Sequence, residues 1–329
     1  MQTYTLPQVI KTDKITCVLS SGISDPKLGF DPDLHLIKNQ IETIPDSIWN
    51  KTIKTEVNLW EDGARPLNRA SLKFDEVASG LKLFLDLPKD MPFICLCEGP
   101  GGFMECILKR RQGNNDMLYG ITLRDDSDKA VPKWKFDRLD MNKIKVYSGL
   151  DGTGNLYDTR NIITFWNQVN CKSLFITADG GFDVKDYNHQ EQISAKLIFC
   201  QIVSALGCQE QSEKSIFVIK MFDNFTFLSA KMLYLLGNFY DSVQITKPIK
   251  SRESNSERYV VARSFRGVSY KELNDLLGII NGWNSSINDI CLDLIIPDEF
   301  LVSLENINKT ICTRQIEAIK KNLQKCKGE

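Results

Sequence analysis

The chain has 329 residues, of which 42% are hydrophobic and 25% charged, and its formal net charge is −1. This composition is typical of a soluble globular protein, and it excludes a nonspecific nucleic-acid coat, which would carry a strong basic excess. The ten cysteines are scattered without a Cys-x-x-Cys pair, and there are only two histidines. We therefore expect reduced thiols and no metal site.

The first part of the chain carries few regular signals. Residues 1–34 are punctuated by proline and glycine and look irregular, and no apolar run has the length of a signal core or a membrane span. A helical stretch is expected from His35 to Trp60. Pro66 breaks it, and a helix carrying Lys73 follows.

From residue 92 onward, apolar strands alternate with helical patterns. Expected strands cover 93–97, 117–123, 173–178, 215–219, 243–246 and 258–263, and expected helices cover 189–206 and 225–236. This alternation predicts an α/β fold with a doubly wound parallel sheet, whose ligands bind at the carboxyl ends of the strands. Residues 268–329 are mostly helical by pattern, with a break at Pro297.

A glycine-rich turn, CEGPGGF at 97–103, follows the first expected strand. Glycines let a ligand approach the backbone closely. The spacing differs from the Gly-x-Gly-x-x-Gly of dinucleotide enzymes, and Pro100 removes a backbone donor. The turn therefore favours a ligand without phosphates, such as S-adenosylmethionine. Asp125 and Asp126 follow the next strand and keep a weaker dehydrogenase alternative open.

Four charged residues, Lys73, Asp179, Lys220 and Glu257, occur in this order at strand ends or on a helix. Each taken alone is more often a turn or surface residue. Lysine is seldom buried without a partner, so Lys220 at the end of an apolar strand needs the acids as neighbours. A lysine whose pKa is lowered by burial and a second ammonium can act as a base. The set predicts methyl transfer to an RNA ribose hydroxyl.

Six motifs carry a resemblance to a known family: LNRASLK at 67–73, CEGPGGF at 97–103, DGTGNL at 151–156, TADGGF at 177–182, KMFD at 220–223 and NSERYVV at 255–261. In these motifs the chain resembles the cap-specific mRNA ribose 2'-O-methyltransferases of the FtsJ-like group. The resemblance implies a Rossmann-like α/β fold with a mostly parallel seven-stranded sheet, and S-adenosylmethionine as methyl donor. It implies an N-terminal extension over 1–64, a methyltransferase domain over 65–267 and a helical C-terminal appendage over 268–329.

The resemblance also implies roles for individual residues. Lys220 would be the base toward the 2'-hydroxyl, with Lys73, Asp179 and Glu257 orienting and tuning it. The methyl-donor site would be lined by Asn68, Cys97, Glu98, Gly99, Pro100, Gly101, Gly102, Phe103, Asn155, Leu156 and Asp179. Capped RNA would touch Thr122, Leu123, Arg124, His189, Gln190, Glu191, Arg252 and Asn255. Glu98 stands where many members carry alanine, and Asn155 where an aspartate is usual. Trp60 is a candidate to stack on the cap guanine, against the alternative of a core tryptophan.

The implied function is methylation of the first transcribed nucleotide of capped mRNA. Methylation of the second nucleotide, methylation of ribosomal or transfer RNA, and a non-catalytic cap-binding subunit remain alternatives. The expected partner is capped mRNA, with RNA polymerase or other capping enzymes left open. A nuclear location is expected for a cellular enzyme, with a cytoplasmic one left open for a viral or parasite enzyme; secretion is not expected.

Overall fold

The computed structural model describes residues 1–11, 17–20, 27–56, 66–182, 186–284, 289–292 and 295–328. Within them, the main sheet has eight strands in the order β1-β8-β9-β7-β6-β3-β4-β5. Their bounds are β1 Gln2–Thr5, β3 Pro92–Leu96, β4 Met117–Ile121, β5 Ile144–Tyr147, β6 Phe175–Ala178, β7 Ser212–Phe222, β8 Tyr240–Lys247 and β9 Glu257–Phe265.

Strands β5, β4, β3, β6 and β7 pair in parallel, whereas β9 runs antiparallel to both β7 and β8. The predicted mostly parallel α/β sheet is therefore confirmed. The eighth strand, β1, pairs antiparallel with β8 and lies in a segment expected to be irregular. An edge strand of four residues has too short a pattern to be read from sequence alone.

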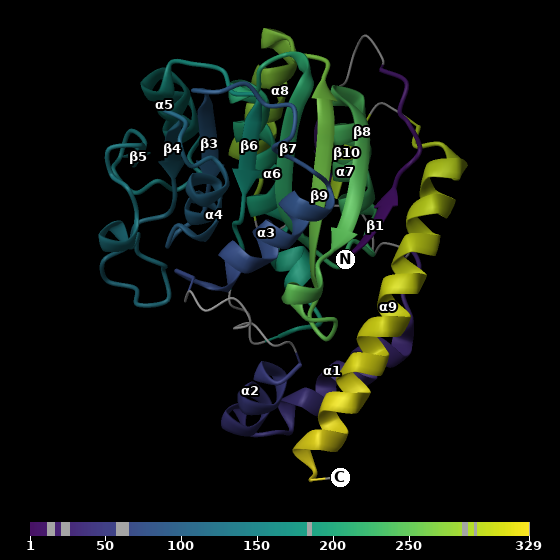
Figure 1. Ribbon diagram of the computed structural model, residues 1–329. Helices are drawn as coiled ribbons and strands as arrows, with labels where there is room; N and C mark the ends of the chain where they lie inside the picture. The colour runs from purple at the N-terminus through teal and green to yellow at the C-terminus, as the bar shows by residue number, and fades with distance from the viewer. Residues whose placement is uncertain are drawn as a thin grey trace.

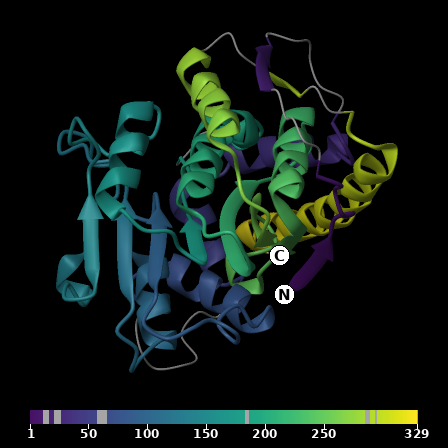
Figure 2. The same ribbon diagram turned by 90° about the horizontal axis from the view of Figure 1, so that it is seen from above.

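Helices cover both faces of the sheet (Figure 2). Helices α3 (Arg69–Gly80) and α4 (Gly102–Arg110) pack on one face. Helices α5 (Thr159–Val169), α6 (Gln190–Cys208) and α7 (Phe227–Phe239) pack on the other, and α8 (Tyr270–Gly282) lies against α6. Asn68 caps α3 by accepting from the Ser71 N–H at 3.2 Å, which fixes where the helix carrying Lys73 begins.

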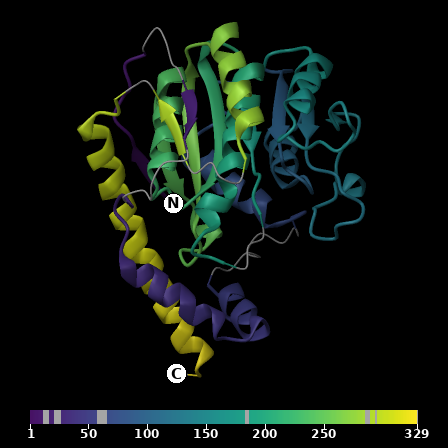
Figure 3. The ribbon, with the colours of Figure 1, turned by 180° about the vertical axis from the view of Figure 1, so that it is seen from behind.

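One helical segment near the N-terminus and one at the C-terminus form a further unit, which we call the terminal lobe (Figures 1 and 3). It consists of α1 (Pro32–Glu42), α2 (Asp46–Lys54) and α9 (Asp298–Cys326). Its core is apolar and joins residues far apart in sequence: Leu34, Ile37, Ile41, Trp49, Phe225, Cys312, Ile316, Ile319 and Leu323. The predicted extension and appendage thus pack together, while their boundaries stay predictions.

Three details refine the predicted elements. Over its described part, residues 35–56, the single helix expected from His35 to Trp60 is two helices, because Pro45 is the N-cap of α2; residues 57–60 lie outside the described ranges. Pro297 is the N-cap of α9, as the predicted break indicated. A small second sheet pairs β2 (Cys17–Ser20) with β10 (Asp289–Leu292). None of the helices in the described ranges is both long and apolar enough to cross a bilayer.

Candidate active site

The sheet register brings three of the four predicted charged residues together. Asp179 directly follows β6, and Lys220 lies in β7, where the neighbouring pair is Ala178 with Ile219. Glu257 begins β9 opposite Phe222 of β7. The parallel strands β6 and β7 end at this edge of the sheet, and the antiparallel strand β9 begins there, so all three side chains face the same space.

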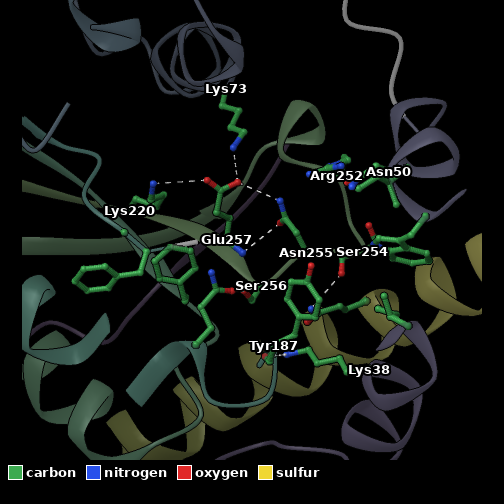
Figure 4. A pocket seen from close by; sticks show the side chains of 18 residues that line it. Lys38, Asn50, Lys73, Tyr187, Lys220, Arg252, Ser254, Asn255, Ser256 and Glu257 are labelled. Atoms are coloured by element: carbon green, nitrogen blue, oxygen red, sulfur yellow. Dashed lines mark hydrogen bonds and ion pairs between the residues drawn. The ribbon is translucent and has the colours of Figure 1, made fainter. Parts of the chain in front are cut away.

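Lysines and carboxylates alternate in this cluster, and Figure 4 shows Glu257 between Lys73 and Lys220. Lys73 Nζ lies 2.5 Å from Glu257 Oε2. Lys220 Nζ lies 3.0 Å from Asp179 Oδ1 and 3.9 Å from Glu257 Oε1, and it also donates to the Asp179 carbonyl at 2.8 Å. The four side chains are between 12% and 15% exposed, so each charge is largely shielded from water yet paired.

Pairing sets the direction of each pKa. Burial would raise the pKa of Glu257, but Lys73 and Lys220 outweigh it and hold that pKa well below its usual range. Burial and the neighbouring ammonium lower the pKa of Lys73. Burial also opposes the charge on Lys220, yet Asp179 and Glu257 raise its pKa above the ordinary lysine value. The expected lowering is therefore wrong for Lys220 in the protein without ligands, because two carboxylates face it.

A second set of residues holds Glu257 in place. Its Oε2 accepts from Ser251 Oγ at 3.0 Å and from Asn255 Nδ2 at 3.1 Å. Lys247 Nζ donates to the Glu257 carbonyl at 2.7 Å and to both the carbonyl and the side-chain oxygen of Asn255 at 2.6 Å. Burial lowers the pKa of Lys247 to about 7. Lys247 is not among the predicted site residues, although a lysine ending an apolar strand carries the same signal as Lys220.

The cluster opens into a cavity of about 440 Å³. Lys73, Lys220 and Glu257 line one side, together with Gly181, Phe182, Tyr187, Gln190, Phe222, Arg252, Ser254, Asn255 and Ser256. The opposite side comes from the terminal lobe, through Lys38, Ile41, Trp49, Asn50, Ile53 and Gln315. Three predicted RNA contacts, Gln190, Arg252 and Asn255, thus reach the cavity that holds the charged cluster.

One lobe residue bridges the two sides of this cavity. Lys38 Nζ donates to Asp223 Oδ2 and to the Tyr187 carbonyl, both at 3.1 Å. Its side chain is 5% exposed, and Asp223 lies three residues after Lys220. The bridge therefore ties α1 of the lobe to the end of β7.

The predicted methyl-donor residues form a close-packed turn beside the cluster. Gly101 starts α4 with φ of +113°, where glycine is favoured. A Cβ on Gly102 would lie 2.0 Å from Asn68 Oδ1, so this contact with the cap of α3 requires glycine. A Cβ on Gly180 would lie 2.9 Å from that of Cys97, which places the turn against the strand end carrying Asp179.

This arrangement fits S-adenosylmethionine at the turn. The glycines let a ligand lie against the backbone, and Gly181 keeps the space next to Lys220 open, since a Cβ there would meet Phe222 at 2.7 Å and Lys220 Cε at 3.3 Å. Gly180 and Gly181 thus lie between the turn, through Cys97, and the Lys220 side chain. The structure describes no metal-binding group of three or more His, Cys, Asp or Glu among the residues it covers.

Glu98 lies in the core below the turn rather than facing solvent. It is 2% exposed, and its Oε1 accepts from Thr177 Oγ1. Its Oε2 has no hydrogen-bond partner among the described residues. Burial raises the pKa of Glu98 well above its usual range, which favours the neutral acid in this apolar setting.

The predicted residues beyond the turn lie along a second cavity of about 320 Å³. Thr122, Leu123 and Arg124 line it, and they do not line the cavity of the charged cluster. The Arg124 N–H donates to the Thr153 carbonyl at 2.6 Å, which sets this segment beside Asn155 and the buried Leu156. Their predicted RNA role stays a prediction, but they lie on the side of the glycine-rich turn.

The remaining predicted RNA contacts differ in setting. Glu191 is buried, and its carboxylate accepts from the Phe225 and Thr226 N–H groups and from Ser229 Oγ. These bonds hold the start of α7, whose N-cap is Thr226. His189 is exposed, with Nδ1 2.6 Å from Asp186 Oδ2. Their role toward RNA stays a prediction, and Trp60 lies outside the described residues.

The part of the chain that holds the cluster and the turn is similar to known proteins. Residues 66–265 match the family model of FtsJ-like methyltransferases. Three relatives are named "Cap-specific mRNA (nucleoside-2'-O-)-methyltransferase 1". The Dictyostelium discoideum protein is 32% identical over 96% of this chain, the Leishmania braziliensis protein 29% over 91%, and the Trypanosoma cruzi protein 32% over 78%. The chain spans 45%, 80% and 74% of their lengths, respectively.

Proposed function

The chain belongs to the FtsJ-like methyltransferase family, and from this premise we propose that it methylates the ribose 2'-hydroxyl of the first transcribed nucleotide of capped mRNA. Family membership confirms the predicted methyltransferase class and S-adenosylmethionine as the methyl donor. The observation that carries the finer proposal is the cluster of Lys73, Asp179, Lys220 and Glu257 at one wall of a cavity beside the glycine-rich turn.

The protein contributes mainly the positioning of the reactants and a proton acceptor. The donor, when bound, supplies an activated methyl group on a sulfonium. The bond from the 2'-oxygen to the methyl carbon would form as that carbon's bond to the donor sulfur breaks, leaving a neutral thioether. Lys220 Nζ accepts the hydroxyl proton in this step and later releases it to solvent. Asp179 and Glu257 orient the amine, and Lys73 keeps Glu257 in place.

Lys220 must lose its proton before it can serve as this base. The paired carboxylates stabilise its ammonium form in the ligand-free protein. A cation bound at the adjoining turn lowers the pKa of a neighbouring ammonium. We therefore expect Lys220 to become a base only when the donor site is filled, which would limit proton removal to the complete complex.

The walls of the cavity support an RNA substrate. Trp49, Phe182, Tyr187 and Phe222 line it, and aromatic side chains are the usual stacking surfaces for unpaired bases. Arg252 adds a guanidinium suited to a phosphate or a base edge. The names of the relatives support a cap next to the reacting nucleotide. The chain spans less than half the length of the Dictyostelium discoideum relative, so the capped substrate is part of this proposal.

The test compares two RNAs that differ only at the 5' end. One carries an N7-methylguanosine cap and the other a plain triphosphate, and both receive labelled methyl from S-adenosylmethionine. We expect label only on the capped RNA, at the first nucleotide and dependent on Lys220. Equal labelling would point to a general RNA ribose methyltransferase, label on the second nucleotide to the other cap position, and binding without labelling to a non-catalytic cap-binding subunit.

A further inference from the structure

The loop from Arg252 to Ser256 connects the cavity to Glu257. Arg252, Ser254, Asn255 and Ser256 line the cavity, and Asn255 Nδ2 donates to Glu257 Oε2 at 3.1 Å. Arg252 has φ of +66°, an unfavourable conformation for a residue with a side chain. A loop with such a residue keeps one shape only when its surroundings hold it.

The terminal lobe supplies that hold from outside the catalytic domain. Glu56, just beyond the end of α2, takes both donors of Ser254: the N–H at 3.0 Å through Oε1 and the hydroxyl at 2.5 Å through Oε2. A carboxylate that accepts from a backbone and a side chain of the same residue fixes its position and its orientation.

Helix α9 completes the contact. Asn322, which is 1% exposed, donates through Nδ2 to Glu56 Oε2 at 2.9 Å. Gln315, on the same face of α9 about two turns before Asn322, donates through Nε2 to the Ser254 carbonyl at 3.4 Å. The loop is therefore clamped by residues from both ends of the chain, neither of which belongs to the charged cluster.

We propose that Glu56, held by Asn322, is a positioning residue through which the terminal lobe sets the RNA-facing loop 252–256 and, through Asn255, the carboxylate of Glu257. The proposal rests on the proposed function for the identity of the substrate. It adds a specific role for the lobe: α2 and α9 control how well RNA is bound, while the donor turn on the other side of the cluster is left unchanged.

The charges near Glu56 agree with this role. Arg252 and Arg69 both face Glu56 and Glu257. Burial lowers the pKa of each guanidinium, and the two arginines repel one another. Loss of the Glu56 carboxylate would remove one of the charges that balance them, so the loop would lose an electrostatic partner as well as two hydrogen bonds.

The experiment compares Glu56→Ala and Asn322→Ala with a matched control, Thr52→Val. Thr52 also links α2 to α9, through the thiol of Cys326 at 3.2 Å, but does not contact the loop. Kinetics should show KM for capped RNA about tenfold higher in Glu56→Ala, with KM for S-adenosylmethionine and the control unchanged, because lost charge-assisted hydrogen bonds are worth about that factor. Glu56→Gln should recover part of the loss, since one amide oxygen still accepts.

A second measurement does not depend on the substrate. Hydrogen exchange of the peptide covering 250–257 should be faster in Glu56→Ala and Asn322→Ala than in the wild type and in Thr52→Val. Unchanged exchange would overturn the clamp whatever RNA the enzyme uses. Faster exchange with unchanged KM for the RNA that the wild type methylates would reduce Glu56 to a structural residue, and a wild type that methylates no capped RNA would count against the proposed function alone.

Discussion

The sheet edge and the terminal lobe enclose the same cavity, but they hold their side chains in different ways. At the sheet edge, strand register places Asp179, Lys220 and Glu257, and every charge is paired within the cluster. In the lobe, an apolar three-helix core carries Trp49 and Asn50 to the opposite wall. We therefore expect the chemical step to depend mainly on the sheet edge, and substrate binding to depend also on the terminal lobe.

Removal of the proposed base should have the largest effect. In Lys220→Ala the ribose hydroxyl loses its proton acceptor, so we expect turnover to fall about a thousandfold while RNA and donor still bind. Single-turnover methyl transfer and equilibrium binding measure the two parts. Lys214→Ala is the control, because Lys214 is an exposed lysine on the same strand. Wild-type turnover in Lys220→Ala would contradict the assignment.

The dependence on pH should reveal the proton held by Lys220. Its pKa in the free protein is raised above the ordinary value of 10.5, so the base form grows about tenfold per pH unit through neutral and mildly alkaline pH. For S-adenosylmethionine as the varied substrate, whose kcat/KM reports the protein before the donor binds, we expect log kcat/KM to rise with a slope of about one, without a plateau below about pH 9. Initial rates across this range check it, and a flat profile would argue that Lys220 is not the group that titrates.

Loss of the lysine behind Glu257 should have a smaller effect. Lys247→Met keeps the length of the side chain but removes three hydrogen bonds to Asn255 and Glu257. We expect kcat to fall about tenfold, because unpaired buried acceptors shift the carboxylate. Lys145→Met, at an exposed position of β5, serves as the control. If kcat stays at the wild-type value while the melting temperature falls, Lys247 supports the fold alone.

Two mild core substitutions, one in the terminal lobe and one under the sheet, should have the smallest effects and should differ only in their effect on KM for RNA. Ile319→Val in the lobe and Ile202→Val in α6 each remove one methylene from a fully buried site and should each cost about 0.5–1.5 kcal/mol of unfolding free energy. We expect only Ile319→Val to raise KM for RNA, by a few-fold, since α9 supports the cavity wall. Denaturant unfolding and steady-state kinetics together check this; equal KM changes in both variants would remove the distinction.

The sheet was predictable because its strands are continuous apolar runs with turn residues after them. The charged cluster was predictable because Asp179 and Lys220 follow the apolar runs of β6 and β7, and because the motifs around Lys73 and Glu257 carry the family resemblance. β7 extends to Phe222, so Lys220 lies within a strand that the apolar pattern ended one residue earlier. Short elements such as β1 and β5 escaped because four residues carry too little periodicity.

The lobe and the clamp could not be predicted in the same way. Leu34 lies in α1 and Ile319 in α9, near opposite ends of the sequence, and no local pattern records that they share a core. The direction of the pKa of Lys220 likewise depends on two distances, to Asp179 and to Glu257, that exist only after folding. Glu56 looks like any polar residue after a helix until Ser254 is beside it.

The placement of α9 has a consequence for the enzyme during translation. Every residue of the charged cluster has been synthesised once the ribosome has passed Glu257, and the sheet is complete at Phe265. The helix that supports the far wall of the cavity begins only at Asp298 and ends at Cys326. Since chains fold as they emerge from their N-terminal end, the charged cluster is complete in a nascent chain before the far wall of the cavity is in place. We therefore expect the cavity to take its final form only after α9 has been made.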